Sequence, residues 1–146
     1  GKPYSVSSGI KLGYLPEERG LYKKEPVIDI MTYFGQLKGM SRLDARQKSL
    51  DFLKRVDLLD KAKTHLDKLS GGQQQKVQLG ITVIDNPELL ILDEPTKGFD
   101  PVNRRLLMEI IEEHQAKGAT VIMITHQMGP HTTTQRRDSA CLRYSR

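Results

Sequence analysis

The second half of the chain alternates apolar runs with an amphipathic segment. Residues 89–92 form a continuous apolar run, which is typical of a strand buried on both faces of a parallel sheet, and residues 119–125 are expected to form a second buried strand. Between them, residues 101–117 have helical spacing, with Pro101 at the first turn and Gly118 after the last. Strand, helix and strand in this order predict a βαβ unit.

The first half is mostly helical in pattern. A short apolar segment over 10–15, stopped by Pro16, predicts one strand. After it, apolar positions recur at helical spacing, and a polar connection with short helical pieces spans 58–69. Helices are expected over 27–37, after the N-cap Ser41, and from Ser70 to just before Asn86-Pro87.

These patterns predict an α/β fold with a helical insert. Residues 1–24 and 86–128 are expected to form parts of an α/β core with parallel strands, and residues 25–85 a helical subdomain. Beyond residue 128 neither period continues, so 129–146 is expected to be an irregular, disordered tail or one foreign to the fold.

Composition narrows the class of protein. The chain has 146 residues, 37% of them hydrophobic and 28% charged, which is ordinary for one soluble domain. The net charge of +5 lies partly in the tail, and a solvated surface explains it better than a nucleic-acid site. Cys141 is the only cysteine, so an intrachain disulfide is excluded, and no apolar run is long enough for a membrane helix.

Two adjacent carboxylates follow the strand at 89–92. Ligands of open α/β sheets bind at the carboxyl ends of the strands, and Asp93 there could hold Mg²⁺, which prefers oxygen ligands. Glu94 need not ligate the metal and could polarise a water for attack on a phosphoryl group. A solvated turn is the alternative for an Asp-Glu pair alone, but Pro95-Thr96 and Asp100 after it make the pattern more specific.

The glycine-rich turn at Ser70-Gly71-Gly72 opens a predicted helix. Backbone N–H groups at such a helix start can face an anion, with the serine as an added donor. A simple loop with an N-cap is the alternative. His126 follows the second strand of the βαβ unit at the same sheet edge as Asp93 and Glu94, where an imidazole could donate to a phosphate oxygen.

Together these residues resemble the ATP-binding-cassette (ABC) ATPases, the nucleotide-binding subunits of ABC transporters. The run 69–73 reproduces the family signature LSGGQ, and 89–94 looks like its Walker B strand. Residues 97–100 match the D-loop, His126 the switch histidine, and 13–17 the segment that leads to the Q-loop. The continuation through residue 22 resembles exporters related to sodium-efflux and drug-efflux ATPases. The resemblance therefore implies a P-loop NTPase core, partial here, with a helical signature subdomain.

The resemblance also implies roles for single residues. In the family, two domains bind ATP and Mg²⁺ between them in a head-to-tail dimer and drive separate transmembrane permease subunits. Asp93 would then position Mg²⁺, Glu94 would activate water, and His126 would hold the γ-phosphate. The remaining site residues would contact nucleotide or the dimer interface: Ser70, Gly71, Gly72 and Gln73 in the signature, Glu17 in the Q-loop and Asp100 in the D-loop.

The chain also departs from the family pattern. Glu17 stands where Gln is usual, and Lys97 and Phe99 replace the usual Ser and Leu of the D-loop. The motif G-x-x-x-x-G-K-[ST] is absent, so we expect a fragment that lacks the Walker A region and is inactive alone.

The resemblance predicts a location at the cytoplasmic face of the cell membrane, as a peripheral subunit, with no nucleic acid as partner. Two alternatives to an exporter ATPase remain open. One is a non-transport ABC ATPase of translation or DNA repair, and the other is a truncated remnant unable to bind ATP.

Overall fold

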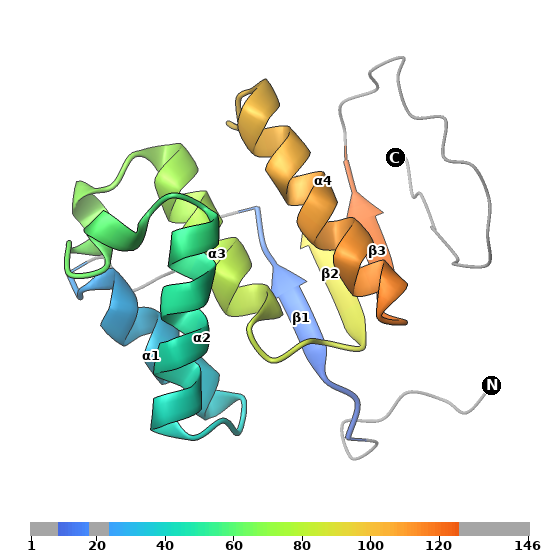
Figure 1. The fold of residues 1–146 in the computed structure, drawn as a ribbon. Coiled ribbons are helices and arrows are strands. Elements are labelled where there is room, and N and C mark those ends of the chain that lie inside the picture. The colour runs from blue at the N-terminus through green and yellow to red at the C-terminus, as the bar shows by residue number, and fades with distance from the viewer. Residues whose placement is uncertain (1–8, 18–23, 126–146) are drawn as a thin grey trace.

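The computed structural model describes residues 9–17 and 24–125 (Figure 1). In chain order, its elements are β1 (Leu12–Leu15), α1 (Val27–Leu37), α2 (Arg42–Arg55), the 3-10 turns η2 (Leu59–Lys61) and η3 (Leu66–Lys68), α3 (Gly71–Val83), β2 (Leu89–Asp93), α4 (Pro101–Ala116) and β3 (Thr120–Ile124).

The three strands form one parallel sheet in the order β1-β2-β3. In the register, Leu15 lies opposite Leu92, and Asp93 lies opposite Ile124. Because the strands are parallel, their carboxyl ends meet at one edge of the sheet. Asp93 ends β2 at this edge, and Glu17 follows β1 there. The predicted α/β class and the predicted βαβ unit are confirmed.

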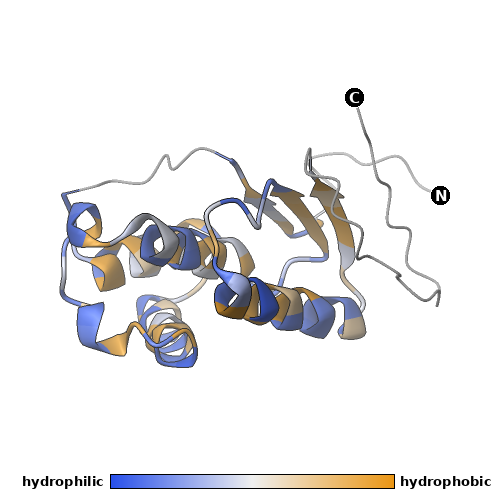
Figure 2. Cartoon of the chain, turned by 90° about the horizontal axis from the view of Figure 1, so that it is seen from above, coloured by the Kyte–Doolittle hydropathy of each residue, from blue (hydrophilic) through white to orange (hydrophobic). Residues whose placement is uncertain are grey.

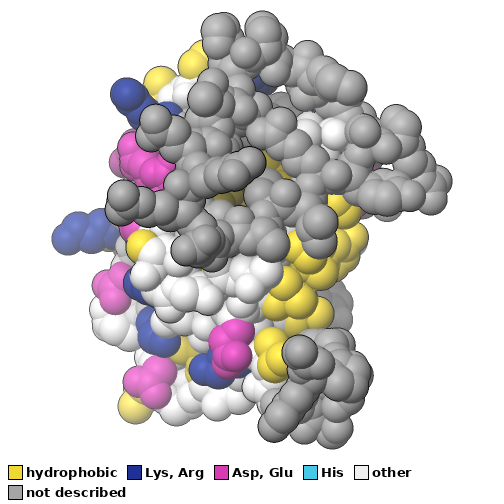
Figure 3. Space-filling model, turned by 90° about the vertical axis from the view of Figure 1, so that its right-hand side faces the viewer, with side chains coloured by type: hydrophobic (Ala, Val, Ile, Leu, Met, Phe, Trp, Pro, Cys, Tyr) yellow, Lys and Arg dark blue, Asp and Glu magenta, His cyan; other side chains and the backbone are white. Residues whose placement is uncertain are grey.

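One face of the sheet is covered by helices and the other is not, within the described residues. Leu90 and Leu92 are fully buried, and α4 lies along one face of the sheet in Figure 2. On β1, Leu12 and Tyr14 alternate with buried positions and are 41% and 52% exposed. Hydrophobic side chains gather along one flank of the molecule in the view of Figure 3.

Helices α1, α2 and α3 share a second part of the apolar core. Met31, Leu53 and Val77, one from each helix, are completely buried. Burying such side chains contributes about 1.5–3 kcal/mol each. Serine N-caps begin two of these helices: the Ser41 and Ser70 side chains accept hydrogen bonds from the N–H groups of Asp44 and Gln73.

A close approach of α3 to β1 joins the helices to the sheet. A Cβ added at Gly13 would lie 2.8 Å from the carbonyl oxygen of Thr82, so only glycine leaves room there. The Thr82 hydroxyl oxygen lies 2.8 Å from the Gln78 carbonyl oxygen of α3 and 3.3 Å from the Tyr14 carbonyl oxygen of β1, so its single proton is shared between the two acceptors. Lys38 adds an ion pair to Asp85 at 2.7 Å and a bond to the Thr82 carbonyl oxygen at 2.9 Å.

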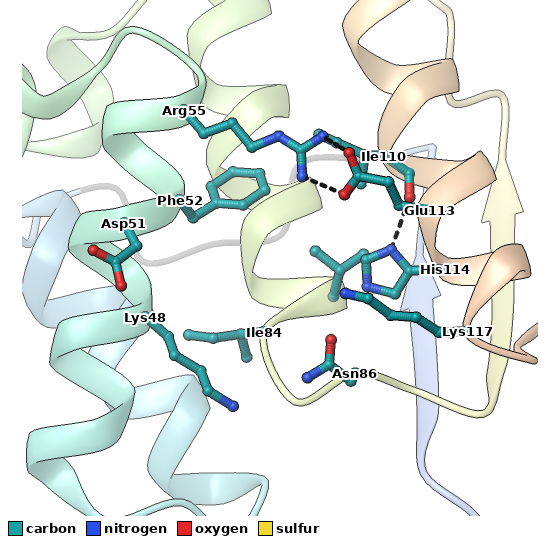
Figure 4. A pocket seen from close by; sticks show the side chains of 11 residues that line it. Lys48, Asp51, Phe52, Arg55, Ile84, Asn86, Ile110, Glu113, His114 and Lys117 are labelled. Carbon is teal, nitrogen blue, oxygen red and sulfur yellow. Dashed lines mark hydrogen bonds and ion pairs between the residues drawn. The ribbon is translucent and has the colours of Figure 1, made fainter.

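A second junction lies between α2 and α4, around a cavity of about 240 Å³ (Figure 4). The Arg55 guanidinium donates to both Glu113 carboxylate oxygens, at 2.5 and 2.7 Å. His114 is buried beside it, with its Nδ1 2.8 Å from the Ile110 carbonyl oxygen. These contacts connect the helical half of the chain to the βαβ unit.

The observed elements match the predicted ones closely at their ends. The strand expected over 10–15 begins at Leu12, and the helix expected over 101–117 ends at Ala116. His126 and the tail 129–146 lie outside the described residues. The division into 1–24 with 86–128 and 25–85 stays a prediction. None of the helices in the described part combines the length and apolar character needed to cross a bilayer.

Candidate functional site

Asp93 ends β2, and Glu94 follows it in an unusual backbone conformation. Glu94 has φ 46°, in the left-handed region that a residue with a Cβ rarely adopts. Its N–H donates to the Ile124 carbonyl oxygen at 2.9 Å, and the residue is only 6% exposed. Such a conformation costs about 1–3 kcal/mol and persists only where its surroundings hold it. The contacts around Glu94 therefore hold its backbone in this conformation.

The turn after Glu94 is held at several points. The Lys97 N–H donates to the Glu94 carbonyl oxygen at 3.0 Å. The buried Gln75 of α3 donates through its side-chain amide to the Pro95 carbonyl oxygen at 3.0 Å. Phe99 is 5% exposed and anchors the end of the turn in the core. The turn thus has fixed contacts to α3 and to the core.

The Ser70 turn forms a complete capping box at the start of α3. The Gln73 N–H donates to the Ser70 hydroxyl oxygen at 3.3 Å, and the Ser70 N–H donates to the Gln73 side-chain oxygen at 2.9 Å. Gly71 and Gly72 form the first helical turn, whose N–H groups have no acceptor within a helix. This arrangement presents backbone donors at the positive end of a helix dipole, as an anion site requires.

The start of α3 lies next to the turn that follows β2. A Cβ built on Gly72 would lie 3.9 Å from the Gly98 carbonyl oxygen, which is ordinary van der Waals contact. Together with the bond from Gln75 to Pro95, this contact places the glycine turn and the turn after Glu94 side by side.

Glu17 and Asp100 have defined partners at the same end of the molecule. The Lys97 ammonium group pairs with the Glu17 carboxylate at 2.5 Å, and this hydrogen bond raises the pKa of Lys97. Asp100 is the N-cap of α4 and accepts from the Asn103 N–H at 2.9 Å. That bond is the main cause of the lowered pKa of Asp100.

Comparison with known proteins shows the family to which the chain belongs. The family model described as ABC transporter matches residues 4–97. The chain belongs to the ABC transporter family. An uncharacterised ABC transporter ATP-binding protein of Methanocaldococcus jannaschii is 47% identical over 81% of this chain and 45% of its own length. The linearmycin resistance ATP-binding protein of Bacillus subtilis is 32% identical over 81% of this chain and 38% of its own length.

A solved structure shares the fold described above. It is the ATP-binding subunit of an ABC transporter, aligned with a TM-score of 0.75 at 26% identity over 84% of this chain and 53% of that one. The chain spans about half the length of the curated relatives it matches. The predicted fold class, a partial ABC-type ATPase, is confirmed.

The structure brings the predicted ABC motifs together to different extents. Asp93 and Glu94 share the carboxyl edge of the sheet with Glu17, and the signature residues 70–73 begin a helix that contacts the turn at 95–98. Asp100 begins α4 at the end of that turn, and His126 lies outside the described residues.

Sequence reasoning missed several contacts of these motifs. Gln75 and Lys97 hold the turn after Glu94 but were not singled out as site residues. For Gln75 no local signal existed, because its acceptor lies twenty residues away. For Asp100 a signal did exist, since an Asp directly before a Pro at the first helical position is a frequent N-cap pattern.

The carboxylates at the sheet edge are ligands of the kind that Mg²⁺ takes. In the described part of the chain, no three His, Cys, Asp or Glu side chains form a metal-binding group. Mg²⁺ keeps several waters and takes one or two carboxylates besides substrate phosphates. Asp93, half-buried at the end of β2, is suitable for that limited share of the ligands.

Proposed function

We propose that this chain is part of the ATP-hydrolysing subunit of an ABC transporter. The observation that carries the proposal is the pair at the end of β2, where Asp93 ends the strand and Glu94 is held buried in a left-handed conformation beside the turn 95–99. A carboxylate that lies next to a metal-binding carboxylate, and that is not itself needed as a metal ligand, can act as a general base.

In this proposal each carboxylate has one task. Asp93 would hold Mg²⁺, which when bound neutralises charge on the phosphate oxygens of ATP. Glu94 would accept a proton from the water whose oxygen attacks the γ-phosphorus, while the bond to the leaving ADP oxygen breaks. His126 would donate to the γ-phosphate.

The signature turn would act on a second copy of the domain. Gly71 and Gly72 begin the helix and are partly exposed, so an anion held by another subunit could approach their N–H groups. The capping box orders this turn in advance, which lowers the entropy cost of binding. We therefore propose a head-to-tail dimer in which residues 70–73 of one subunit contact ATP held by the other. Glu17 would sense nucleotide and couple the site to the membrane subunit, and Asp100 would link the two nucleotide sites across the dimer interface.

Partners and direction of transport complete the proposal. Transmembrane permease subunits would bind at the cytoplasmic face of the membrane, and no nucleic acid is expected. Relatives include both a resistance protein and a methionine import protein of Ligilactobacillus salivarius. Export is proposed from the resemblance of residues 13–22 to efflux ATPases.

The decisive experiment replaces the proposed base in the protein expressed from its complete coding sequence. Glu94→Gln is expected to abolish ATP turnover, measured as phosphate release, and to keep ATP binding. Glu88→Gln is the matched control, because Glu88 is an exposed glutamate before the other end of β2. Undiminished turnover in Glu94→Gln would refute the role of Glu94.

A mixing experiment tests the head-to-tail dimer. Ser70→Arg and Glu94→Gln are each expected to be inactive as homodimers. In a mixed dimer, one shared site carries both changes and the other carries neither, so activity should return. If each site were built from one subunit, both sites of the mixed dimer would carry a change, and no activity would return.

A further inference from the structure

Lys97 bridges the ends of two neighbouring strands. Its backbone N–H donates to the Glu94 carbonyl oxygen at 3.0 Å, directly after β2. Its ammonium group pairs with Glu17, two residues after β1, at 2.5 Å. One residue therefore connects the Glu94 backbone to a segment 80 positions away in the sequence.

The Glu94 backbone needs such support on this side. Its left-handed conformation is costly, and its own N–H donates to the Ile124 carbonyl oxygen at the end of β3. Gln75 holds the next residue, Pro95, from α3. The Lys97–Glu17 ion pair supplies the contact from β1.

The charges at this edge are consistent with that arrangement. The pKa of Lys97 is raised mainly by its hydrogen bond and charge interaction with Glu17. The negative charge of Glu94 adds a smaller contribution in the same direction. The cation thus attracts the Glu94 carboxylate as well as pairing with that of Glu17. Both members of the pair are solvent-accessible, so the attraction alone adds little to global stability, and any effect should be local.

We propose that Lys97 is a positioning residue for Glu94: by pairing with Glu17 it ties the turn after β2 to the end of β1 and keeps the Glu94 carboxylate in place at the sheet edge. The proposal rests on the proposed ATPase function. It assigns a role to a side chain that matches neither the usual D-loop residue nor any of the predicted site residues.

Four variants of the complete protein test the proposal: Lys97→Met, Glu17→Gln, their combination, and Lys97→Arg, which keeps the charge. Lys63→Met is the control, because Lys63 is exposed and lies on the connection between η2 and η3. The readouts are kcat and KM for ATP and the hydrogen-exchange rate of the Lys97 amide, whose acceptor is the Glu94 carbonyl oxygen.

Loss of the tie should misplace the base without removing it. We expect Lys97→Met to lower kcat about tenfold at nearly constant KM, since small misplacements of a catalytic group cost one to two orders of magnitude. The Lys97 amide should exchange about threefold faster, the size expected for an exposed ion pair. The double variant should lower kcat no further than the more impaired single variant does. Lys97→Arg should have the kcat and the Lys97 amide exchange rate of the unmodified protein.

The outcomes separate this proposal from the proposed function. Unchanged exchange and kcat in Lys97→Met, or fully additive effects in the double variant, would overturn the positioning role while leaving the ATPase intact. If the unmodified protein hydrolyses no ATP, the proposed function fails, and the exchange rates alone decide whether Lys97 holds the Glu94 turn.

Discussion

Gly13 on β1 offers a direct test of how the helical half is joined to the sheet. In the structure a Cβ at this position would lie 2.8 Å from the Thr82 carbonyl oxygen, 3.0 Å from Leu90 Cδ1 and 3.0 Å from Pro87 Cγ. The nearest atom belongs to the backbone of α3, which cannot turn away as a side chain would. Gly13→Ala must therefore move β1 and α3 apart.

The size of the effect follows from the overlap. The Cβ would be about 0.6 Å inside the 3.4 Å distance at which ordinary contacts begin. Overpacking of this kind typically costs about 1–3 kcal/mol, and replacing a glycine in a strand returns about 0.5–1 kcal/mol. We expect Gly13→Ala to lower the free energy of unfolding by about 1–2 kcal/mol.

Urea denaturation followed by circular dichroism measures this difference, with Gly72→Ala as the matched control. A Cβ on Gly72 meets nothing closer than 3.9 Å, and alanine is the better helix former by up to about 1 kcal/mol. The two substitutions should therefore shift stability in opposite directions. If Gly13→Ala were as stable as the unmodified protein, β1 and α3 could not approach each other as described.

Two further predictions concern single hydrogen-bonded side chains. Ser70→Ala removes the hydroxyl that caps α3 and should lower the free energy of unfolding by about 1 kcal/mol. Ser70→Asn should keep most of the stability, because asparagine is also a good N-cap. Equal losses of stability in the two variants would argue against the cap. Glu113 has a lowered pKa because Arg55 donates to it, so its stabilisation is present above the ordinary value of 4.5 and is lost as the pH falls through the lowered native pKa. In urea, Glu113→Gln should thus be less stable than the unmodified protein at pH 7, by under about 1 kcal/mol for this half-exposed pair, and the difference should shrink as the pH falls through the lowered native pKa. Glu112→Gln, at the exposed neighbouring position, should show no such convergence.

Local signals in the sequence predicted most of the fold. The continuous apolar run at Leu89–Leu92 identified the central strand, and Ser41 and Ser70 identified two helix starts, because capping uses residues three positions apart. Asp93 and Glu94 were predicted as site residues from their place at a strand end. Each of these signals depends only on neighbours in the chain.

Contacts between distant segments could not be predicted in the same way. The pairing of Glu17 with Lys97 and the close approach of Gly13 to Thr82 join positions about seventy to eighty residues apart. The left-handed conformation of Glu94 is likewise unusual for its residue type, and the preference of the residue itself argues against it. Only the tertiary contacts around the turn explain these features.

The long-range contacts gather where the proposed chemistry takes place. Gln75 reaches the turn after β2 from α3, Lys97 connects it to β1, and Ile124 holds it from β3. Each contact comes from a different element, so the position of the turn depends on α3, β1 and β3 together. Because α3 begins with the signature turn, the same helix carries both the proposed anion site at residues 70–73 and Gln75, which holds the Pro95 carbonyl oxygen. A continuous series of contacts, from the capping box at Ser70 through Gln75 to Pro95, therefore joins the start of α3 to the carboxylate edge of the sheet within a single chain.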